Sequence, residues 1–177
     1  MNYIISFISG FQGIIGAVFG TVATLITTEL IKSLGRLKFY FNDISIEYSG
    51  ENERGFTDII VTDVTKADAC GYKFRVQIYN SSETIKILKD FKVEFVLESR
   101  SIYNKPNNRD EYIQHDCFLE YKDFNLIHIL PKNMIEINMC GNIYNENMIE
   151  FSKLKKVYFI AQNHNNNKTI KKLIKKF

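Results

Sequence analysis

The chain has 177 residues and a formal net charge of +3 at pH 7, and 14% of its residues are aromatic although it has no tryptophan. This small net charge does not by itself indicate binding to nucleic acid, and three cysteines without C-x-x-C spacing argue against a secreted disulfide framework. The many Asn, Ile and Lys residues are typical of an AT-rich bacterial or phage genome.

The N-terminal stretch from Tyr3 to Thr28 contains no Asp, Glu, Lys, Arg or His. At about 1.5 Å per helical residue it is long enough to cross the roughly 30 Å hydrocarbon layer of a bilayer. An apolar run in lipid must satisfy its own backbone hydrogen bonds, so we expect one membrane-spanning helix. Residues 1–35 form the first unit, in which Gly35 is expected to cap the helix in a left-handed conformation and to act as a hinge.

The residues on either side of this stretch indicate whether it is cleaved and how it is oriented in the membrane. A cleavable secretory signal would have a basic leader, a shorter apolar core and a small-x-small cleavage site, which only Val22 to Thr24 imitates. A retained anchor is therefore the better interpretation. Lys32, Arg36 and Lys38 follow the span and no cation precedes it. This asymmetry predicts an N-terminus outside and a cytoplasmic domain at the inner or plasma membrane.

Small residues recur every three or four positions along the span. Gly13, Gly16 and Gly20 share one helical face, and the stretch from Gly16 to Gly20 is a GxxxG sequence. Such a face allows two helices to approach closely, and in lipid close packing attracts helices to one another. We therefore predict a homo-oligomer that packs through these three glycines. The alternative is that glycine is simply common in membrane helices.

Beyond Gly35 the hydrophobic period changes from that of a helix to two. Leu37 to Phe41 and Ile44 to Tyr48 each alternate, so we expect two strands joined by a turn at Asn42-Asp43. Further strands are expected at 57–64, 72–79, 91–97, 117–121, 125–130, 134–140 and 157–162, with loops at 80–90 and 104–108 and a turn at 131–133. The predicted fold class is mainly β with one transmembrane helix: an antiparallel β-sandwich or small barrel, Ig-like or similar, over residues 36–163 in the cytosol.

Residues 164–177 return to a helical period, with apolar side chains at positions 170, 173, 174 and 177. The other face of this expected helix has four lysines: Lys171, Lys172, Lys175 and Lys176. We expect a basic amphipathic C-terminal tail whose lysines contact an anionic membrane surface. The alternatives are a solvated C-terminus and a helix that packs its apolar face on the β-domain.

The sequence contains none of the standard phosphate-binding, zinc or nucleophile motifs. Its one cluster of reactive residue types, His115-Asp116-Cys117, lies on an extended stretch, where neighbouring side chains point to alternate faces. Cys117 with His128 or His164 as a base would make a catalytic pair, but a lone cysteine in an apolar strand more often fills a core. We therefore predict a non-enzymatic protein with no catalytic, cofactor-binding or metal-binding residues.

Basic and aromatic residues are interleaved in the stretch Tyr72 to Arg75, as in a nucleic-acid platform. Because the alternation is regular, Phe74 is expected to be buried, with Lys73 and Arg75 solvated on the other face. Nucleic acid is therefore not an expected partner.

The glycine-rich span runs directly into the strand Leu37 to Phe41, and a Phe-x-Val-x-Ile-x-Asn strand follows from Phe74 to Asn80. This architecture resembles many small bacterial and phage membrane proteins. It is also broadly similar to the membrane effectors of bacterial antiphage systems, which implies a cytosolic β-barrel that senses a cyclic nucleotide and spans that oligomerise to breach the membrane. Those effectors commonly have more than one span, and no residue-by-residue match places a ligand-binding position on this chain.

The sequence thus predicts a single-span, non-enzymatic interaction or sensing module with a cytosolic β-domain. Its expected partners are the lipid bilayer, further copies of the chain, and a protein or small ligand of unknown identity. The alternative is a membrane-disrupting effector whose β-domain binds a small anionic ligand, for example a cyclic nucleotide in antiphage defence. Overproduction should depolarise cells if the chain is an effector and should not if it is an interaction module.

Overall fold

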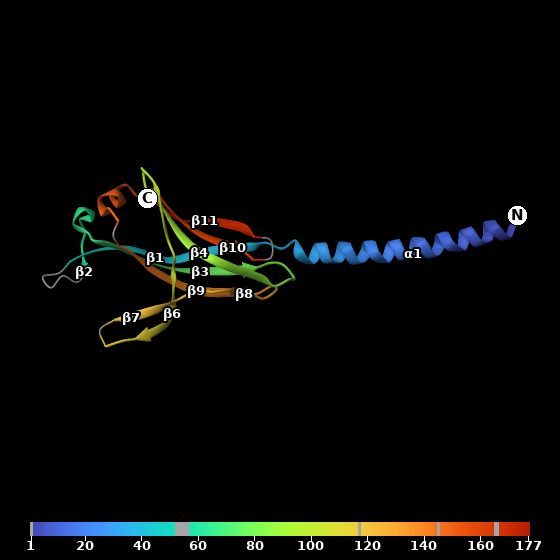
Figure 1. The fold of residues 1–177 in the computed structure, drawn as a ribbon, viewed down its shortest axis with the longest axis horizontal. Coiled ribbons are helices and arrows are strands. Elements are labelled where there is room, and N and C mark those ends of the chain that lie inside the picture. The colour runs from blue at the N-terminus through green and yellow to red at the C-terminus, as the bar shows by residue number, and fades with distance from the viewer. Residues whose placement is uncertain (1, 52–56, 117, 145, 165–166) are drawn as a thin grey trace.

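The computed structural model describes residues 2–51, 57–116, 118–144, 146–164 and 167–177. A long N-terminal helix projects from one end of a β-sandwich (Figure 1). This helix, α1 (Asn2–Ser33), contains the segment Gly13–Lys32, which has a mean hydropathy of 1.8 and is not buried against the rest of the chain. By length and composition, α1 is able to cross a membrane.

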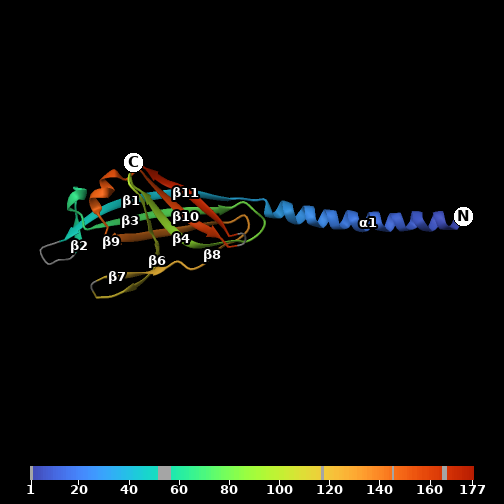
Figure 2. The ribbon, with the colours of Figure 1, turned by 45° about the horizontal axis from the view of Figure 1, so that its top comes forward.

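The rest of the chain is mainly antiparallel β-structure, which confirms the predicted fold class. One sheet has the strand order β2-β1-β3-β9-β6-β7, and the other has the order β11-β10-β4-β5 with β8 also paired to β4. The two sheets lie face to face as layers (Figure 2). The strands are β1 (Leu37–Glu51), β2 (Thr57–Ile60), β3 (Ala69–Asn80), β4 (Lys86–Val96), β5 (Ser101–Asn104), β6 (Asn107–Gln114), β7 (Leu119–Asp123), β8 (Ile127–Ile129), β9 (Met134–Tyr144), β10 (Lys156–Asn163) and β11 (Lys168–Lys176).

The expected turn at Asn42-Asp43 is wrong, because β1 continues through it as one strand. Its register against β3 shifts between Asn42 and Ser45, and Asp43 has a φ of 51°. A β-bulge of this kind inserts a residue and moves the following side chains to the opposite face. The change of parity between Phe41 and Ile44 is therefore produced by a bulge and not by a hairpin.

Several loops and strand ends also differ from expectation. β2 stops at Ile60, and a 3-10 helix, η1 (Val64–Lys66), occupies the end of the strand expected at 57–64. β4 begins at Lys86, inside the loop expected at 80–90, and β6 begins at Asn107, inside the loop expected at 104–108. A second 3-10 helix, η2 (Met148–Lys153), precedes β10.

The expected C-terminal helix is wrong, because residues 168–176 form β11 and pair with β10 from Asn163↔Lys168 to Lys156↔Lys176. Ile170 and Ile174 face the core, whereas Leu173 and Phe177 are exposed. Positions i and i+4 share a face in both a helix and a strand, so this apolar pair fits either structure. Pairing with β10 satisfies the backbone, which a two-turn helix in water does poorly.

Aromatic side chains fill the middle of the sandwich. Phe159 is fully buried, and its ring centroid lies 5.7 Å from Phe39, 5.8 Å from Phe41 and 6.1 Å from Phe91. These residues come from both sheets, so the rings join the two layers. In β3 the side chains alternate strictly, so Tyr72 and Phe74 are buried in the core. Lys73 and Arg75 lie on the outer face of the sheet, as expected.

The junction between α1 and the sandwich is fixed by backbone contacts. The Glu83 amide donates to the Lys32 carbonyl at 3.0 Å, and the Ser81 hydroxyl both accepts from the Arg36 amide and donates to the Arg36 carbonyl, each at 2.8 Å. Gly35 does not have the left-handed conformation expected of a helix cap. It is needed because it passes close to the backbone of Ser82, so it belongs to a clamp and not to a hinge.

Candidate functional site

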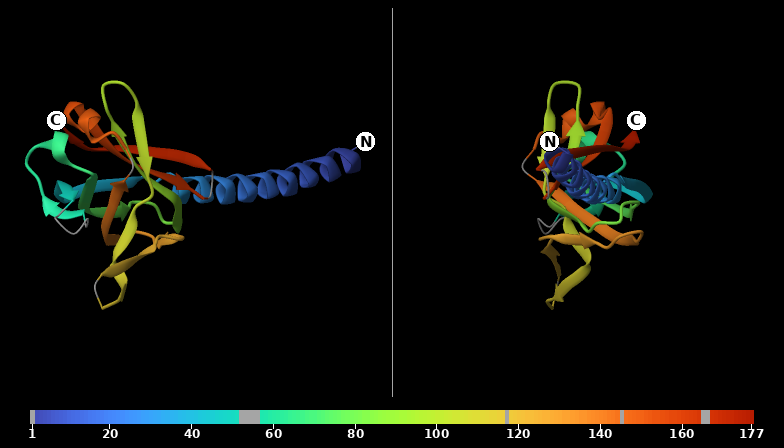
Figure 3. Two further views of the ribbon diagram at one scale, coloured as in Figure 1. Left: turned by 60° about the vertical axis from the view of Figure 1, so that its left-hand side comes forward. Right: turned by 90° about the vertical axis from the view of Figure 1, so that its right-hand side faces the viewer.

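A hairpin of β6 and β7 stands away from the sandwich as an arm (Figure 3). Of the arm's described residues, Asn107 and Asn108 are the ones that pair with β9. The Asp110 carboxylate adds a second attachment, since it accepts from the Asn138 side chain at 2.9 Å and from the Asn138 amide at 3.3 Å. The arm contributes little to the core, because its large apolar side chains are exposed: Tyr112, Ile113, Phe118 and Leu119.

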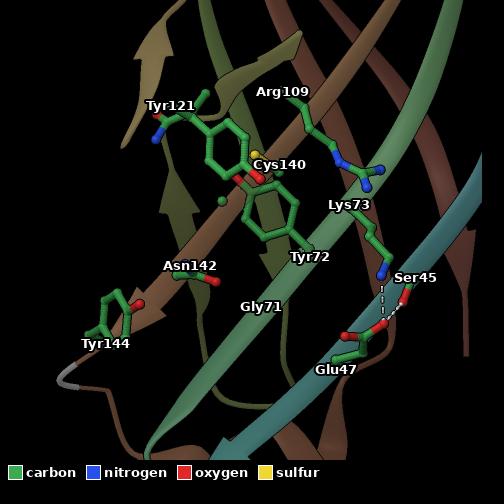
Figure 4. A pocket seen from close by; sticks show the side chains of 12 residues that line it. Ser45, Glu47, Gly71, Tyr72, Lys73, Arg109, Tyr121, Cys140, Asn142 and Tyr144 are labelled. Atoms are coloured by element: carbon green, nitrogen blue, oxygen red, sulfur yellow. Dashed lines mark hydrogen bonds and ion pairs between the residues drawn. The ribbon is translucent and has the colours of Figure 1, made fainter. Parts of the chain in front are cut away.

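A pocket of about 410 Å³ lies between this arm and the outer face of the β1-β3-β9 sheet (Figure 4). Strands that alternate place one set of side chains in the core and the other set on this outer face. The pocket is lined by Ser45 and Glu47 of β1, Gly71, Tyr72 and Lys73 of β3, Asn107 and Arg109 of β6, Tyr121 of β7, and Cys140, Gly141, Asn142 and Tyr144 of β9.

The floor of the pocket depends on Gly141. A Cβ at this position would lie 2.4 Å from the Tyr72 Oη, so glycine leaves the space for the buried Tyr72 ring. The Tyr72 hydroxyl donates to Asn104 Oδ1 at 2.6 Å, and Asn104 Nδ2 donates to the Asn142 carbonyl at 3.0 Å. Burial raises the pKa of Tyr72 well above its usual range, so the hydroxyl keeps its proton.

One side of the pocket is an ion pair. Lys73 Nζ lies 3.0 Å from Glu47 Oε1, and the Ser45 hydroxyl donates to the same carboxylate oxygen at 2.6 Å. These hydrogen bonds, from Ser45 and then from Lys73, hold the pKa of Glu47 below its usual value. The charge of Lys73 is therefore already compensated within the site.

Arg109 supplies the uncompensated charge. Among the residues that the structure describes, no carboxylate or carbonyl accepts a hydrogen bond from its guanidinium, which points along the pocket wall (Figure 4). Tyr121 and Tyr144 flank the same space, and burial raises the pKa of the Cys140 thiol, which keeps it protonated. A guanidinium can hold a carboxylate or a phosphate through two parallel hydrogen bonds.

The sequence did not predict these residues. Arg109 belongs to a stretch, NNRDEYIQ, in which apolar and polar residues do not alternate, because both faces of the arm are exposed. Tyr121 lies in the middle of β7 and Tyr144 at the end of β9, and neither has a motif around it. The available signal is the position of two tyrosines, Tyr112 and Tyr121, within a charged segment that has no core to fill.

The glycines predicted to pack α1 lie along an open helix surface. A Cβ at Gly13, Gly16 or Gly20 would meet no other atom within 4 Å. Thr21 and Thr24 turn their hydroxyls back to the carbonyls of Ala17 and Gly20, at 2.9 and 2.8 Å, so these polar groups are satisfied within the helix. This face is free to accept a second helix, and self-association stays a prediction.

The four tail lysines do not share one location. Because β11 runs away from α1, Lys171 and Lys172 lie toward the helix-proximal end and Lys175 and Lys176 toward the opposite end (Figure 1). Lys171 forms an ion pair with the buried carboxylate of Glu94, and Lys172 lies over the Phe39 ring, 5.9 Å from its centroid. Contact of these lysines with a membrane surface stays a prediction.

The three histidines of the sequence lie on different elements of the fold. His115 is on the arm, stacked on Phe118 with 4.5 Å between ring centroids and 3.0 Å from Glu120. His128 pairs with Ile87 across β8 and β4, and the amide of His164 donates to the carbonyl of the same Ile87. Cys117 lies outside the described residues, and within the described ones no group of three or more His, Cys, Asp or Glu is arranged to hold a metal ion.

Solved structures with a similar arrangement are distant. The chain is 11% identical to a FixG-related protein from Vibrio parahaemolyticus, with a TM-score of 0.36, covering 81% of this chain and 97% of the other. It is 9% identical to an uncharacterized beta-sandwich protein from Clostridium difficile 630, with a TM-score of 0.35, covering 79% and 86%.

Sequence comparison is more informative. Residues 35–175 match the family model described as the YopI Ig-like domain. The chain is also 31% identical, over 168 residues, to the SPbeta prophage-derived uncharacterized protein YopI of Bacillus subtilis (strain 168), which covers 93% of this chain and 94% of the relative. Residues 35–177 make up less than that share of the chain, so the similarity extends into α1. The chain therefore belongs to the YopI Ig-like domain family.

Proposed function

We propose that this protein is a single-span membrane module, not an enzyme, whose Ig-like domain is held at the cytoplasmic surface and recognises a partner protein. The observation that carries the proposal is the clamp between α1 and the sandwich. An exposed helix that has no charged residue from Tyr3 to Thr28 is joined directly to the domain by hydrogen bonds at Lys32 and Arg36. If α1 spans the bilayer, the clamp fixes the orientation of the domain relative to the membrane. The β6–β7 arm then projects to the side of the α1 axis (Figure 3).

The pocket beside the arm supports recognition of a protein. Tyr and Arg are enriched at the energetically important positions of protein interfaces, and Arg109, Tyr121 and Tyr144 all line this pocket. The exposed guanidinium favours an acidic segment of the partner, whose carboxylate would replace water around Arg109. The exposed apolar residues of the arm, including Ile113 and Leu119, would extend the contact beyond the pocket.

A small anionic ligand is the second candidate, because the pocket volume of about 410 Å³ lies within the range of ligand sites. Under this second candidate, the chain is an effector that disrupts the membrane when the ligand binds at Arg109. The two candidates differ in cells: an effector should depolarise the membrane when overproduced or when supplied with its ligand, and an interaction module should not.

Two measurements test the anchor. Alkaline carbonate extraction should leave the full chain in the membrane pellet. Fusion of alkaline phosphatase or green fluorescent protein to the C-terminus should give an inactive phosphatase and a fluorescent reporter, because Lys32, Arg36 and Lys38 follow the span. An active phosphatase with a dark fluorescent protein would overturn the cytoplasmic assignment.

Photo-crosslinking tests the partner surface. A benzoyl-phenylalanine at Tyr144, in the pocket, should give a discrete crosslinked product in cells, whereas the same residue at the exposed Tyr103 of β5 should not. Arg109→Gln should abolish the product without changing the near-ultraviolet circular dichroism of the protein. A product that survives Arg109→Gln, or one that appears equally at Tyr103, would show that the pocket is not the recognition surface.

A further inference from the structure

The end of the sandwich next to α1 is assembled from three segments bound to one another. Besides the bond from Glu83 to Lys32, the Lys132 amide donates to the Ser82 carbonyl at 3.2 Å, and Lys132 Nζ donates to the Ser81 carbonyl at 2.9 Å. The β3–β4 loop, the β8–β9 turn and the end of α1 therefore form one rigid surface. We call it the helix-proximal end.

The position of this surface follows from that of the span. The apolar segment of α1 ends at Lys32, and the Glu83 amide is hydrogen-bonded to that residue. The polar headgroup layer on each side of the hydrocarbon is about 5–8 Å deep. A backbone group in direct contact with the end of the span must then lie within the headgroups, together with its neighbours Ser81 and Ser82.

A basic pocket of about 400 Å³ opens at the helix-proximal end. Of the described residues that line it, none is acidic and five are cationic: Arg36, Lys86, Lys168, Lys171 and Lys172. They converge from the junction after α1, the start of β4 and the start of β11. Lys171 forms an ion pair with Glu94, which does not line the pocket, and the described lining itself consists of cationic and uncharged residues.

The cations at the opposite end of the sandwich are arranged differently. Lys153 lies 3.0 Å from the Glu98 carboxylate, and Arg100 lies 2.7 Å from Glu146 and 3.0 Å from Glu150. Acidic partners therefore compensate these charges. The described lining of the pocket next to α1 includes no acidic residue, and this local composition does not follow from the overall charge of +3.

Apolar side chains surround the same end. Leu34 is 71% exposed, Ile85 is 45% exposed and Leu130 is 53% exposed. They lie on the three segments that form the helix-proximal end, next to α1 and not on the distal loops. Exposed aliphatic tips beside lysines are the composition that binds at a bilayer interface, where the tips enter the acyl boundary and the cations meet lipid phosphates.

We propose that the helix-proximal pocket binds the phosphate of an anionic lipid headgroup, with Leu34, Ile85 and Leu130 inserted beside it. This proposal rests on the proposed membrane anchor. It assigns the ligand class to a phosphodiester of the bilayer, because the pocket opens where the headgroups lie. Binding there fixes the tilt of the domain, since α1 and the pocket are two separate attachments to the membrane.

The absence of tryptophan from the chain gives a direct assay. Full-length Ile85→Trp is reconstituted into vesicles of phosphatidylcholine with a minority of phosphatidylglycerol, and energy transfer from the new tryptophan to dansyl-labelled phosphatidylglycerol or phosphatidylcholine is compared. Transfer should be several-fold greater to the anionic label than to the neutral one. Ile149→Trp, an exposed isoleucine in η2 at the opposite end, is the matched control and should show no preference.

Charge removal tests the pocket itself. In the Ile85→Trp background, Lys86→Gln, Lys168→Gln and Lys172→Gln together should abolish the preference for anionic lipid, because each cation near an anionic surface contributes roughly fivefold to the attraction. The same number of changes at the distal end, Lys153→Gln, Lys155→Gln and Lys176→Gln, should leave it unchanged. Equal loss in both triple variants would show that the net charge of the domain, and not the pocket, attracts the lipid, and would overturn the proposal.

Two further outcomes separate the possible failures. Millimolar glycerol phosphate at constant ionic strength should not reduce the preference, and if it does, the pocket is a site for soluble phosphates and the lipid assignment is wrong. If carbonate extraction retains the protein but Ile85→Trp shows equal transfer to both labels, the headgroup proposal fails and the anchor stands. If extraction releases the protein, the anchor fails and the headgroup proposal fails with it.

Discussion

Gly35 lies against Ser82 so closely that a Cβ on Gly35 would be 2.1 Å from the Ser82 Cα. Gly35→Ala must therefore displace the β3–β4 loop or open the junction, with a loss of about 1–3 kcal/mol in the free energy of unfolding. Chemical denaturation of the full chain in detergent micelles, followed by tyrosine circular dichroism, measures this loss. Gly20→Ala is the control, because a Cβ there meets nothing within 4 Å. Equal stability of the two variants would contradict the clamp.

The small-residue face of α1 predicts association within the membrane. Gly16→Ile and Gly20→Ile should hold two helices apart and reduce crosslinked dimers, because the open space at these glycines is what allows close approach. Val18→Ile, on another face, adds bulk without blocking that approach and should change the yield much less. If the same oligomers form in wild type and in both glycine variants, the glycines do not mediate packing.

Asn80 is a buried polar residue that connects the loops of the helix-proximal end. Its side-chain amide donates to the carbonyls of Thr84 at 2.8 Å and Ile129 at 3.0 Å, and its carbonyl accepts from the Ser82 hydroxyl at 2.6 Å. Asn80→Ala should cost about 3 kcal/mol of stability or more, since each buried group left without a partner costs about 1–3 kcal/mol. Denaturation beside the exposed-site control Asn125→Ala checks this, and a difference near zero would contradict it.

The Glu94–Lys171 pair predicts a dependence on pH. Burial acts to raise the pKa of Glu94, but hydrogen bonds from Lys171, Ser101 and Tyr103 outweigh it and hold that pKa below the usual 4.5. A carboxyl with a lowered pKa binds fewer protons when folded, so its stabilising contribution is complete above the usual pKa and is lost as the pH falls.

Unfolding free energies measured between about pH 5 and pH 3 should therefore fall less steeply in Glu94→Gln than in wild type. Glu111→Gln provides the comparison, because Glu111 is exposed and lies 3.9 Å from Lys122, a distance at which an exposed pair contributes little. If all three proteins lose stability with the same slope, Glu94 is not the group that acid protonates.

The strands that fill the core were predictable because their alternation has a physical cause. In β3, Phe74, Val76 and Ile78 face the core of the sandwich, and charged or polar residues lie between them. The period of two is therefore visible in the sequence. The bulge at Asp43 was not predictable, because a turn and an inserted residue both reverse the parity of the apolar positions. Only the partner strand, β3, which pairs on both sides of the bulge, distinguishes them.

The candidate site was hidden for a related reason. Arg109 lies in an arm that has no buried face, so its sequence lacks the alternation of a strand, and Asn107, Asn108 and Asp110 beside it are residues typical of a loop. The basic pocket could not be predicted from the sequence pattern either, because Arg36, Lys86 and Lys168 are far apart in the chain. They line one pocket because β4 and β11 both begin next to the α1 junction. The tail lysines were recognised as basic, but their pairing with β10 divides them between two ends of the sandwich.

The path of β1 has a mechanical consequence. This strand begins at Leu37, directly after the junction, and continues the line of α1 through the length of the sandwich (Figures 1 and 2). It is paired with β3 from Leu37↔Asn80 to Ser49↔Ala69, through hydrogen bonds that run across the strands. Tension applied along the helix pulls β1 lengthwise and loads these bonds in shear, so many must break together. A pull on α1 is therefore resisted by all of these hydrogen bonds together, and it does not break them one at a time from Leu37 onward.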